Sequence, residues 1–234
     1  MIQTPVRENL LRIQERIATA AARAGRRAEE ITLIAVSKTH PASAVREAYE
    51  AGIRHFGENR VQEWEGKRGG TEGLAATWHL IGHLQSNKAA RAVKLFHSVD
   101  SVDDFAIAQR LDRARAEGDV SDKLRVLIEV RVAPEETKSG VEISELPALV
   151  EKFAQLPRLE LAGLMCIPPF LEEAERVRPY FKRLRELRED LTQKLGLALP
   201  VLSMGMSNDF EVAIEEGATE VRVGTAIFGV REYK

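Results

Sequence analysis

The 234-residue sequence has a single cysteine, Cys166, so no disulfide can form within the chain. It also lacks an apolar run that approaches the roughly 20 residues of a membrane-spanning helix. The N-terminal segment carries charged residues from Arg7 onward, unlike the apolar core of a signal peptide. Cysteine usage of this kind is typical of a reducing compartment, and we expect a cytoplasmic location and no contact with membranes.

An excess of charge of one sign is absent as well. Lys and Arg number 34 and Asp and Glu 36, which gives a net charge of −2. A nucleic-acid-binding protein usually carries a basic excess, so we expect no nucleic-acid partner. The sequence contains no GxGxxG, GxxxxGK[ST] or GxSxG motif, which removes the usual signatures of dinucleotide binding, nucleotide triphosphate binding and serine hydrolysis.

Short apolar segments alternate with amphipathic helical patterns along the chain. Eight segments read as strands: Ile31–Val36, Ile53–Gly57, Trp78–Gly82, Phe96–Asp100, Arg125–Val132, Leu159–Cys166, Val201–Gly205 and Glu220–Gly224. Helices are predicted between them: Pro41–Tyr49, Glu58–Lys67, Asn87–Val93, Val102–Glu117, Ile143–Gln155, Glu173–Leu195 and Asn208–Glu216. Such alternation predicts parallel strands with right-handed crossovers, and eight units close into a (β/α)8 TIM barrel.

The N-terminal segment adds a helix to this pattern. Val6, Leu10, Ile13 and Ile17 recur at helical spacing, so we expect a helix within residues 1–27 that packs on the barrel. About ten residues follow the last strand, too few for a full helix, and the N-terminal helix is expected to fill that gap. One domain over residues 1–234 is predicted, with an open doubly wound sheet as the alternative.

Barrel enzymes and binding proteins place their sites at the carboxyl ends of the strands. Lys38 leaves the first predicted strand at that end. A lysine that is partly desolvated there has a lowered pKa and can attack a carbonyl group as the neutral amine. A solvated lysine that merely flanks a strand is the alternative, and position alone does not decide between them.

The segments around the seventh and eighth strands have the composition of an anion site. Barrels commonly bind phosphate after these two strands. Hydroxyl donors and glycines that allow close backbone approach are Ser203, Ser207, Thr225, Gly205 and Gly224. Asn208 and Glu211 match a helix N-cap and its capping-box partner, so a helix is expected to begin there.

Metal and thiol chemistry are not expected. His79 and His83 are four residues apart but fall on a predicted strand and turn, whereas paired zinc ligands at that spacing lie on a helix. Cys166 lies in an apolar strand and reads as a buried, inert thiol.

Five motifs in order along residues 31–229 resemble the YggS/PROSC family of pyridoxal phosphate homeostasis proteins. They are Ala35–Lys38, Phe56–Asn59 with Val61–Glu63, Trp78–Gly82 with Leu84–Lys88, Ser203–Ser207, and Val223–Gly229. The resemblance implies a barrel like the N-terminal domain of alanine racemase, the fold-type III arrangement of proteins that bind pyridoxal 5′-phosphate (PLP).

The resemblance also implies roles for individual residues. Lys38 would hold PLP as an internal aldimine, and the phosphate cradle would be Ser203, Ser207, Gly224 and Thr225. Asn59 would lie near the cofactor and Arg222 would face the pyridine nitrogen. Two positions depart from the family pattern: Arg131 replaces a small polar residue, which is expected to alter the floor of the pocket, and Asn208 stands where an acid is common.

The function implied by the resemblance is intracellular PLP homeostasis: a monomer that stores the cofactor, delivers it to PLP-dependent apoenzymes and regulates its level. On this reading the protein has no robust turnover and no catalytic residue. The alternatives are a PLP-dependent amino-acid racemase-like enzyme and a cofactor-free aldolase that uses Lys38. Racemases of this type add a β domain that supplies a tyrosine, and no such domain is expected after Lys234.

Overall fold

Eight parallel strands form one closed barrel in the order β1 to β8. The computed structural model describes residues 5–118, 122–133 and 139–229. The strands are β1 Thr32–Val36, β2 His55–Glu58, β3 Thr77–Leu80, β4 Ser98–Val102, β5 Leu124–Glu129, β6 Leu159–Met165, β7 Val201–Ser203 and β8 Glu220–Val223. Each overlaps a predicted strand, β1 pairs with β8, and the alternative of an open sheet is therefore wrong.

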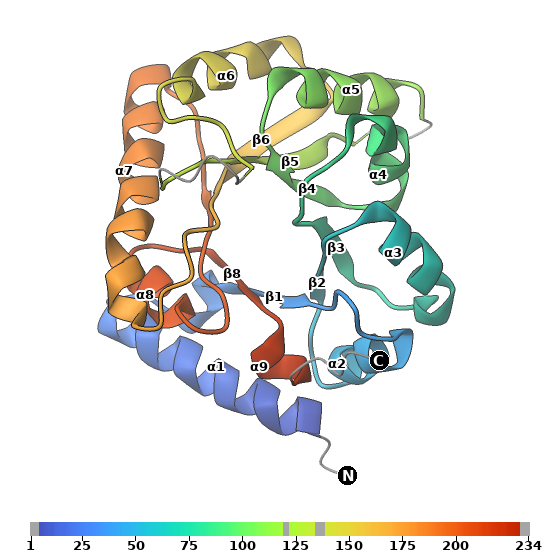
Figure 1. Ribbon diagram of the computed structural model, residues 1–234, viewed down its shortest axis with the longest axis vertical. Helices are drawn as coiled ribbons and strands as arrows, with labels where there is room; N and C mark the ends of the chain where they lie inside the picture. The colour runs from blue at the N-terminus through green and yellow to red at the C-terminus, as the bar shows by residue number, and fades with distance from the viewer. Residues whose placement is uncertain (1–4, 119–121, 134–138, 230–234) are drawn as a thin grey trace.

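Helices surround the barrel as an outer layer (Figure 1). Their bounds are α1 Pro5–Arg23, α2 Ala42–Glu50, α3 Val61–Lys67, α4 Ala89–Leu95, α5 Phe105–Ala116, α6 Leu146–Lys152, α7 Arg178–Leu195, α8 Phe210–Glu215 and α9 Thr225–Phe228. Pro179 lies in the first turn of α7, where its missing N–H costs no helical hydrogen bond. The short helix α9 was not predicted. No helix among the described residues is long and apolar enough to cross a membrane.

Helix α1 takes a place in the outer ring beside α8 and α9 (Figure 1). Its apolar stripe is buried: Val6, Leu10, Ile13, Ile17, Ala20 and Ala21. The side chain of Asn9 donates a hydrogen bond of 3.0 Å to the carbonyl of Ile227 in α9. The N-terminal helix thus covers the side of the barrel where α9, a single turn, is the one helix after β8 within the described residues.

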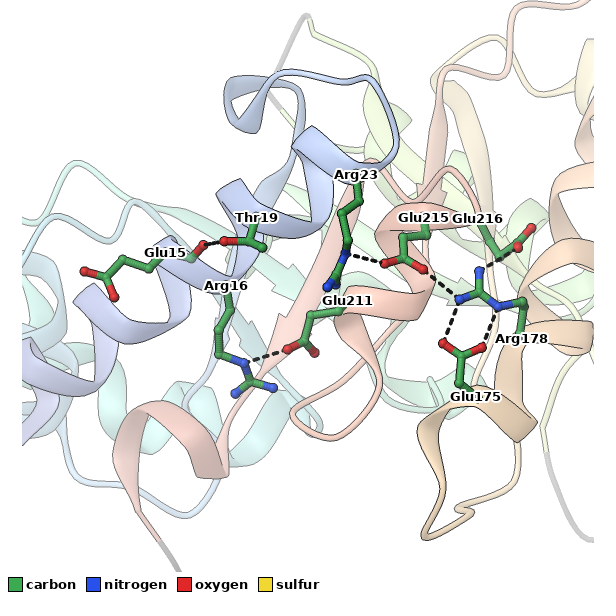
Figure 2. Close-up of polar contacts among 9 residues, drawn as sticks. All are labelled: Glu15, Arg16, Thr19, Arg23, Glu175, Arg178, Glu211, Glu215 and Glu216. Atoms are coloured by element: carbon green, nitrogen blue, oxygen red, sulfur yellow. Dashed lines mark hydrogen bonds and ion pairs between the residues drawn. The ribbon is translucent and has the colours of Figure 1, made fainter.

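Ion pairs hold α8 between α1 and α7 (Figure 2). On one side, Arg16 pairs with Glu211 at 2.6 Å and Arg23 with Glu215 at 2.8 Å. On the other side, Arg178 of α7 pairs with Glu215 at 2.6 Å. Each pair is partly exposed and contributes little alone, but together they fix α8 from two directions. The turn that leads into α8 contributes to the cavity described below.

Candidate functional site

A cavity of about 620 Å³ opens at the carboxyl ends of the strands. Six of the seven site residues singled out in the sequence line it: Lys38, Asn59, Ser207, Arg222, Gly224 and Thr225. They follow or end strands β1, β2, β7 and β8, so residues distant in sequence meet at one end of the barrel. The volume lies in the range of pockets that hold a cofactor-sized molecule.

Lys38 sits on a firmly held loop after β1. The hydroxyl of the preceding Ser37 donates to Glu58 at 2.6 Å, and Lys67 donates to the Ser37 carbonyl at 2.7 Å. Thr39, which follows, has φ 66° and its amide donates to the Glu63 carboxylate. Left-handed backbone is uncommon for threonine. The lysine itself is half-buried, so its backbone is fixed while its amine reaches the cavity.

Ser203 is the predicted site residue that does not line the cavity. It is fully buried, and its hydroxyl oxygen accepts a hydrogen bond of 2.8 Å from the guanidinium of Arg222. Arg222 donates a second hydrogen bond of 2.8 Å to the carbonyl of Cys166. Ser203 thus lies outside the lining of the cavity and contacts Arg222, which does line it. Burial raises the pKa of the Cys166 thiol to about 12, which keeps it inert.

The turn between β7 and α8 differs from its predicted form. The helix begins at Phe210, and the Asp209 carboxylate accepts a hydrogen bond of 2.6 Å from the amide of Met206. Asn208 is not the cap: its side chain donates to the carbonyl of Leu171 at 3.1 Å. The predicted capping box at Asn208 and Glu211 is wrong because the N-cap position of α8 is Asp209, and the Asn208 side chain is engaged with Leu171. Burial raises the pKa of the Asp209 carboxyl.

A glycine shapes the β7 turn, and a hydrogen bond links this turn to the one after β8. Gly205 has φ 93°, and a Cβ there would lie 2.6 Å from Cβ of Ala213, so both conformation and space require glycine. After β8, the amide of Ala226 donates to the hydroxyl of Ser207 at 3.4 Å. This hydrogen bond joins the turn of Ser207 to the turn of Thr225, and both residues line the cavity.

Sequence reasoning missed Glu129, the last residue of β5. Its side chain lines the cavity and is only 5% exposed. Burial raises the pKa of this carboxyl to about 7; Asp103 raises it further, whereas Arg222 and His83 lower it. A glutamate between the apolar residues Ile128 and Val130 was the available signal, since the core positions of a parallel strand are usually apolar.

The rim of the cavity includes residues without a predicted role. His40 stacks on Phe228 with ring centroids 4.8 Å apart, and Phe170 is 74% exposed beside the opening. Arg131 does not line the cavity; it pairs with Glu142 and donates to the carbonyl of Gly140. The effect of Arg131 on the floor of the pocket stays a prediction.

Deeper in the barrel lies a polar cluster. His79 contacts Asp100 at 3.0 Å, and Arg125 pairs with Glu220 at 2.6 Å and with Asp100 at 3.6 Å. One ligand atom from each of His79, Asp100 and Glu220 lies within 4.8 Å of the others, a spacing that a metal ion could use. Arg125 already supplies positive charge to both carboxylates. The expectation of no metal site stays a prediction.

The arrangement suits a phosphorylated aromatic aldehyde. A half-buried lysine can attack the carbonyl group, hydroxyls and backbone amides of two adjacent turns can donate to a phosphate, and a buried guanidinium closes the floor. These features lie in one cavity among the described residues. They fit PLP in size and in donor set.

Comparisons with known proteins agree with this arrangement. The family description "Alanine racemase, N-terminal domain" matches residues 9–232. The protein named pyridoxal phosphate homeostasis protein from Aquifex aeolicus is 47% identical over 226 residues, covering 97% of this chain and 98% of that protein. The protein of the same name from Pseudomonas aeruginosa is 49% identical over 228 residues, covering 97% and 96%.

Solved structures show the same fold. PipY of Synechococcus elongatus, determined with PLP bound, has a TM-score of 0.81 and 42% identity, and covers 91% of this chain and 100% of PipY. Alanine racemase from Corynebacterium glutamicum has a TM-score of 0.70 at 20% identity, covering 97% of this chain and 61% of the racemase. At that identity the racemase likeness concerns the fold alone.

Proposed function

The chain belongs to the pyridoxal phosphate homeostasis protein family, and from that premise we propose that it binds PLP in the cavity at the carboxyl ends of the strands. In this proposal the protein stores the cofactor, releases it to PLP-dependent apoenzymes and so regulates its level. The name of its relatives and the PLP-bound PipY structure support this role. The observation that carries it is the convergence of Lys38, Ser207, Thr225 and Arg222 on one cavity.

Lys38 is the proposed covalent attachment point. When bound, PLP supplies an aldehyde carbon with which an amine forms a reversible bond. The hydrogen bonds to Ser37 and Thr39 hold the backbone on both sides of Lys38, which lines the cavity. The neutral amine is the form that attacks a carbonyl carbon.

Ser207, Gly224 and Thr225 are proposed to hold the phosphate, with Asn59 on the neighbouring wall. Hydroxyl and backbone donors to a dianion form charge-assisted hydrogen bonds, which are stronger than neutral ones. Ser203 contributes in this proposal by accepting from Arg222 rather than by touching the phosphate.

Arg222 is proposed to face the pyridine nitrogen. Two like charges about 4 Å apart repel by up to roughly 4 kcal/mol at an effective dielectric constant of 20. The guanidinium therefore holds that nitrogen unprotonated, whereas strong electron withdrawal by PLP needs a protonated ring. We propose a carrier without robust turnover, acting as a monomer in the cytoplasm, over a racemase-like enzyme. The name shared by its relatives supports this choice, to which Arg222 contributes without deciding it.

The absorption spectrum of the purified protein tests the proposal, before and after borohydride. A visible band that borohydride removes, with the cofactor then fixed to the chain, supports a PLP carrier. A protein that shows no such band after incubation with PLP would favour the cofactor-free aldolase instead. Pyridoxine phosphate, which has no aldehyde, serves as the control ligand that cannot produce the band.

A further inference from the structure

Glu129 and Lys38 line the same cavity from opposite walls. Lys38 follows β1 and Glu129 ends β5, and in the closed order of eight strands these two are four strands apart in either direction. The barrel in Figure 1 has β5 across the opening from β1. A ligand joined to Lys38 thus has the Glu129 side chain across from its point of attachment.

The Glu129 carboxylate has no hydrogen-bond or ion-pair partner among the described residues, although it is only 5% exposed. Its burial together with its place in the lining means that it faces the cavity. A buried carboxylate normally has such a partner. Glu129 instead presents its charge to whatever enters the site.

Charged groups near Glu129 come from three other strands or loops. Asp103 lies in the loop after β4, His83 in the loop after β3, and Arg222 on β8. The two basic groups are already engaged: His83 pairs with Asp103 at 3.1 Å, and Arg222 donates to Ser203 and Cys166. Neither forms an ion pair with Glu129, so the negative charge is not cancelled at close range.

We propose that Glu129 is a specificity-determining residue whose carboxylate disfavours any ligand that brings a second carboxylate into the cavity. The site then favours PLP itself over conjugates of PLP with amino acids. This inference rests on the proposed function for the ligand that occupies the cavity. In this proposal, a PLP molecule in the cavity has a lower affinity for free amino acids, because their carboxylate would lie near that of Glu129.

Two carboxylates in this cavity would lie within a distance at which salt screens weakly, since the Debye length is about 8 Å at physiological ionic strength. Both carboxylates would also lose part of their hydration, which costs free energy for each ionised group. The effect depends on ionisation: burial raises the pKa of Glu129 to about 7, so its carboxyl group is more ionised at pH 8 than at pH 6. Discrimination against carboxylates should therefore appear as pH rises through 7.

Two stable ligands test the inference without any reaction: N-(5′-phosphopyridoxyl)-L-alanine and N-(5′-phosphopyridoxyl)ethylamine differ in one carboxylate. Their Kd values for the apoprotein are measured by calorimetry at pH 8 and pH 6. The ratio of the alanine Kd to the ethylamine Kd is expected to fall about tenfold at pH 8 in Glu129→Gln. In the native protein the same ratio should fall between pH 8 and pH 6.

The matched control is Glu160→Gln, which removes an exposed carboxylate on β6 and changes the net charge equally. An unchanged ratio in Glu129→Gln, or an equal fall in Glu160→Gln, would overturn the inference while leaving the proposed function intact. Failure of the native protein to bind PLP itself would overturn the proposed function as well. Failure of the ethylamine conjugate to bind a protein that binds PLP would overturn the inference alone, because the site would then reject a conjugate that has no carboxylate. The pH comparison on the native protein keeps the inference testable if Glu129→Gln does not fold.

Discussion

Arg125 on β5 donates a hydrogen bond of 2.6 Å to the carboxylate of Glu220 on β8, inside the barrel. The same guanidinium lies 3.6 Å from the fully buried Asp100 on β4. Barrel interiors are usually filled by branched apolar side chains. Here one arginine links three strands and balances two carboxylates below the cavity.

Replacement of Arg125 by methionine should destabilise the protein markedly. Removal of one partner from a buried ion pair leaves an uncompensated charge and costs about 3–5 kcal/mol. Because the Arg125 side chain is 23% exposed, we expect about 3 kcal/mol, measured by urea denaturation at pH 7. The control is Arg91→Met, whose exposed pair with Glu65 should cost less than about 1 kcal/mol. Equal losses in the two variants would contradict a role for Arg125 in the barrel.

The free energy of unfolding of the apoprotein should depend on pH through the ionisation of Glu129. Burial raises its folded-state pKa from 4.5 to about 7, so folding favours the protonated carboxyl group. The contribution of this group to the free energy of unfolding is fully present below pH 4.5 and is lost as pH rises through 7. Glu129→Gln does not ionise and should be more stable than the native protein at pH 8, by at most about 3 kcal/mol. Urea denaturation of both proteins at several pH values measures the gap, which should close by pH 4.5. A gap that is constant with pH would exclude a buried, ionised Glu129.

The phosphate contacts predict a ligand-dependent loss of affinity. Removal of one hydrogen-bond partner of a charged group costs about 1–3 kcal/mol, or roughly 5- to 150-fold in Kd. The double variant Ser207→Ala with Thr225→Ala should bind PLP more weakly by at least that factor and bind pyridoxal, which lacks the phosphate, almost unchanged. Thr19→Ala, at an exposed position of α1, is the control for loss of a hydroxyl group. Equal losses for both ligands would place the phosphate elsewhere.

The carrier reading predicts little chemistry on amino acids. The PLP-loaded protein, incubated with a panel of L-amino acids in deuterated water, should incorporate no α-deuterium beyond a single turnover, as followed by mass spectrometry. Ordinary enzymes turn over at about 1–10³ s⁻¹. Incorporation at such rates would restore the racemase-like alternative.

The barrel was predictable because short β-branched runs alternate with helical patterns, a rhythm that few architectures satisfy. The depth of each side chain within the barrel could not be predicted from the sequence. Ser203 and Ser207 belong to one motif, yet Ser203 is buried under Arg222 while Ser207 lines the cavity. Sequence spacing gives the face of a strand to which a residue points, but the level at which it meets its neighbours depends on how the strands are staggered.

The charged interior was missed for a related reason. Asp100 and Glu220 are 120 residues apart, and each stands at the end of its predicted strand. Their link through Arg125 exists only once β4, β5 and β8 share one barrel. The role of Glu129 was not predicted for the same reason, because it depends on the position of this residue across the cavity from Lys38.

The most direct test of the account locates the bound cofactor. The protein is loaded with PLP, reduced with borohydride, digested and mapped by mass spectrometry, with Lys38→Ala treated in parallel. We predict a single phosphopyridoxyl group on Lys38, and none in the variant, although phosphate contacts still allow it some reversible binding. A phosphopyridoxyl group on another lysine, such as Lys88, or an equal yield from Lys38→Ala, would contradict the assignment of this cavity as the PLP site.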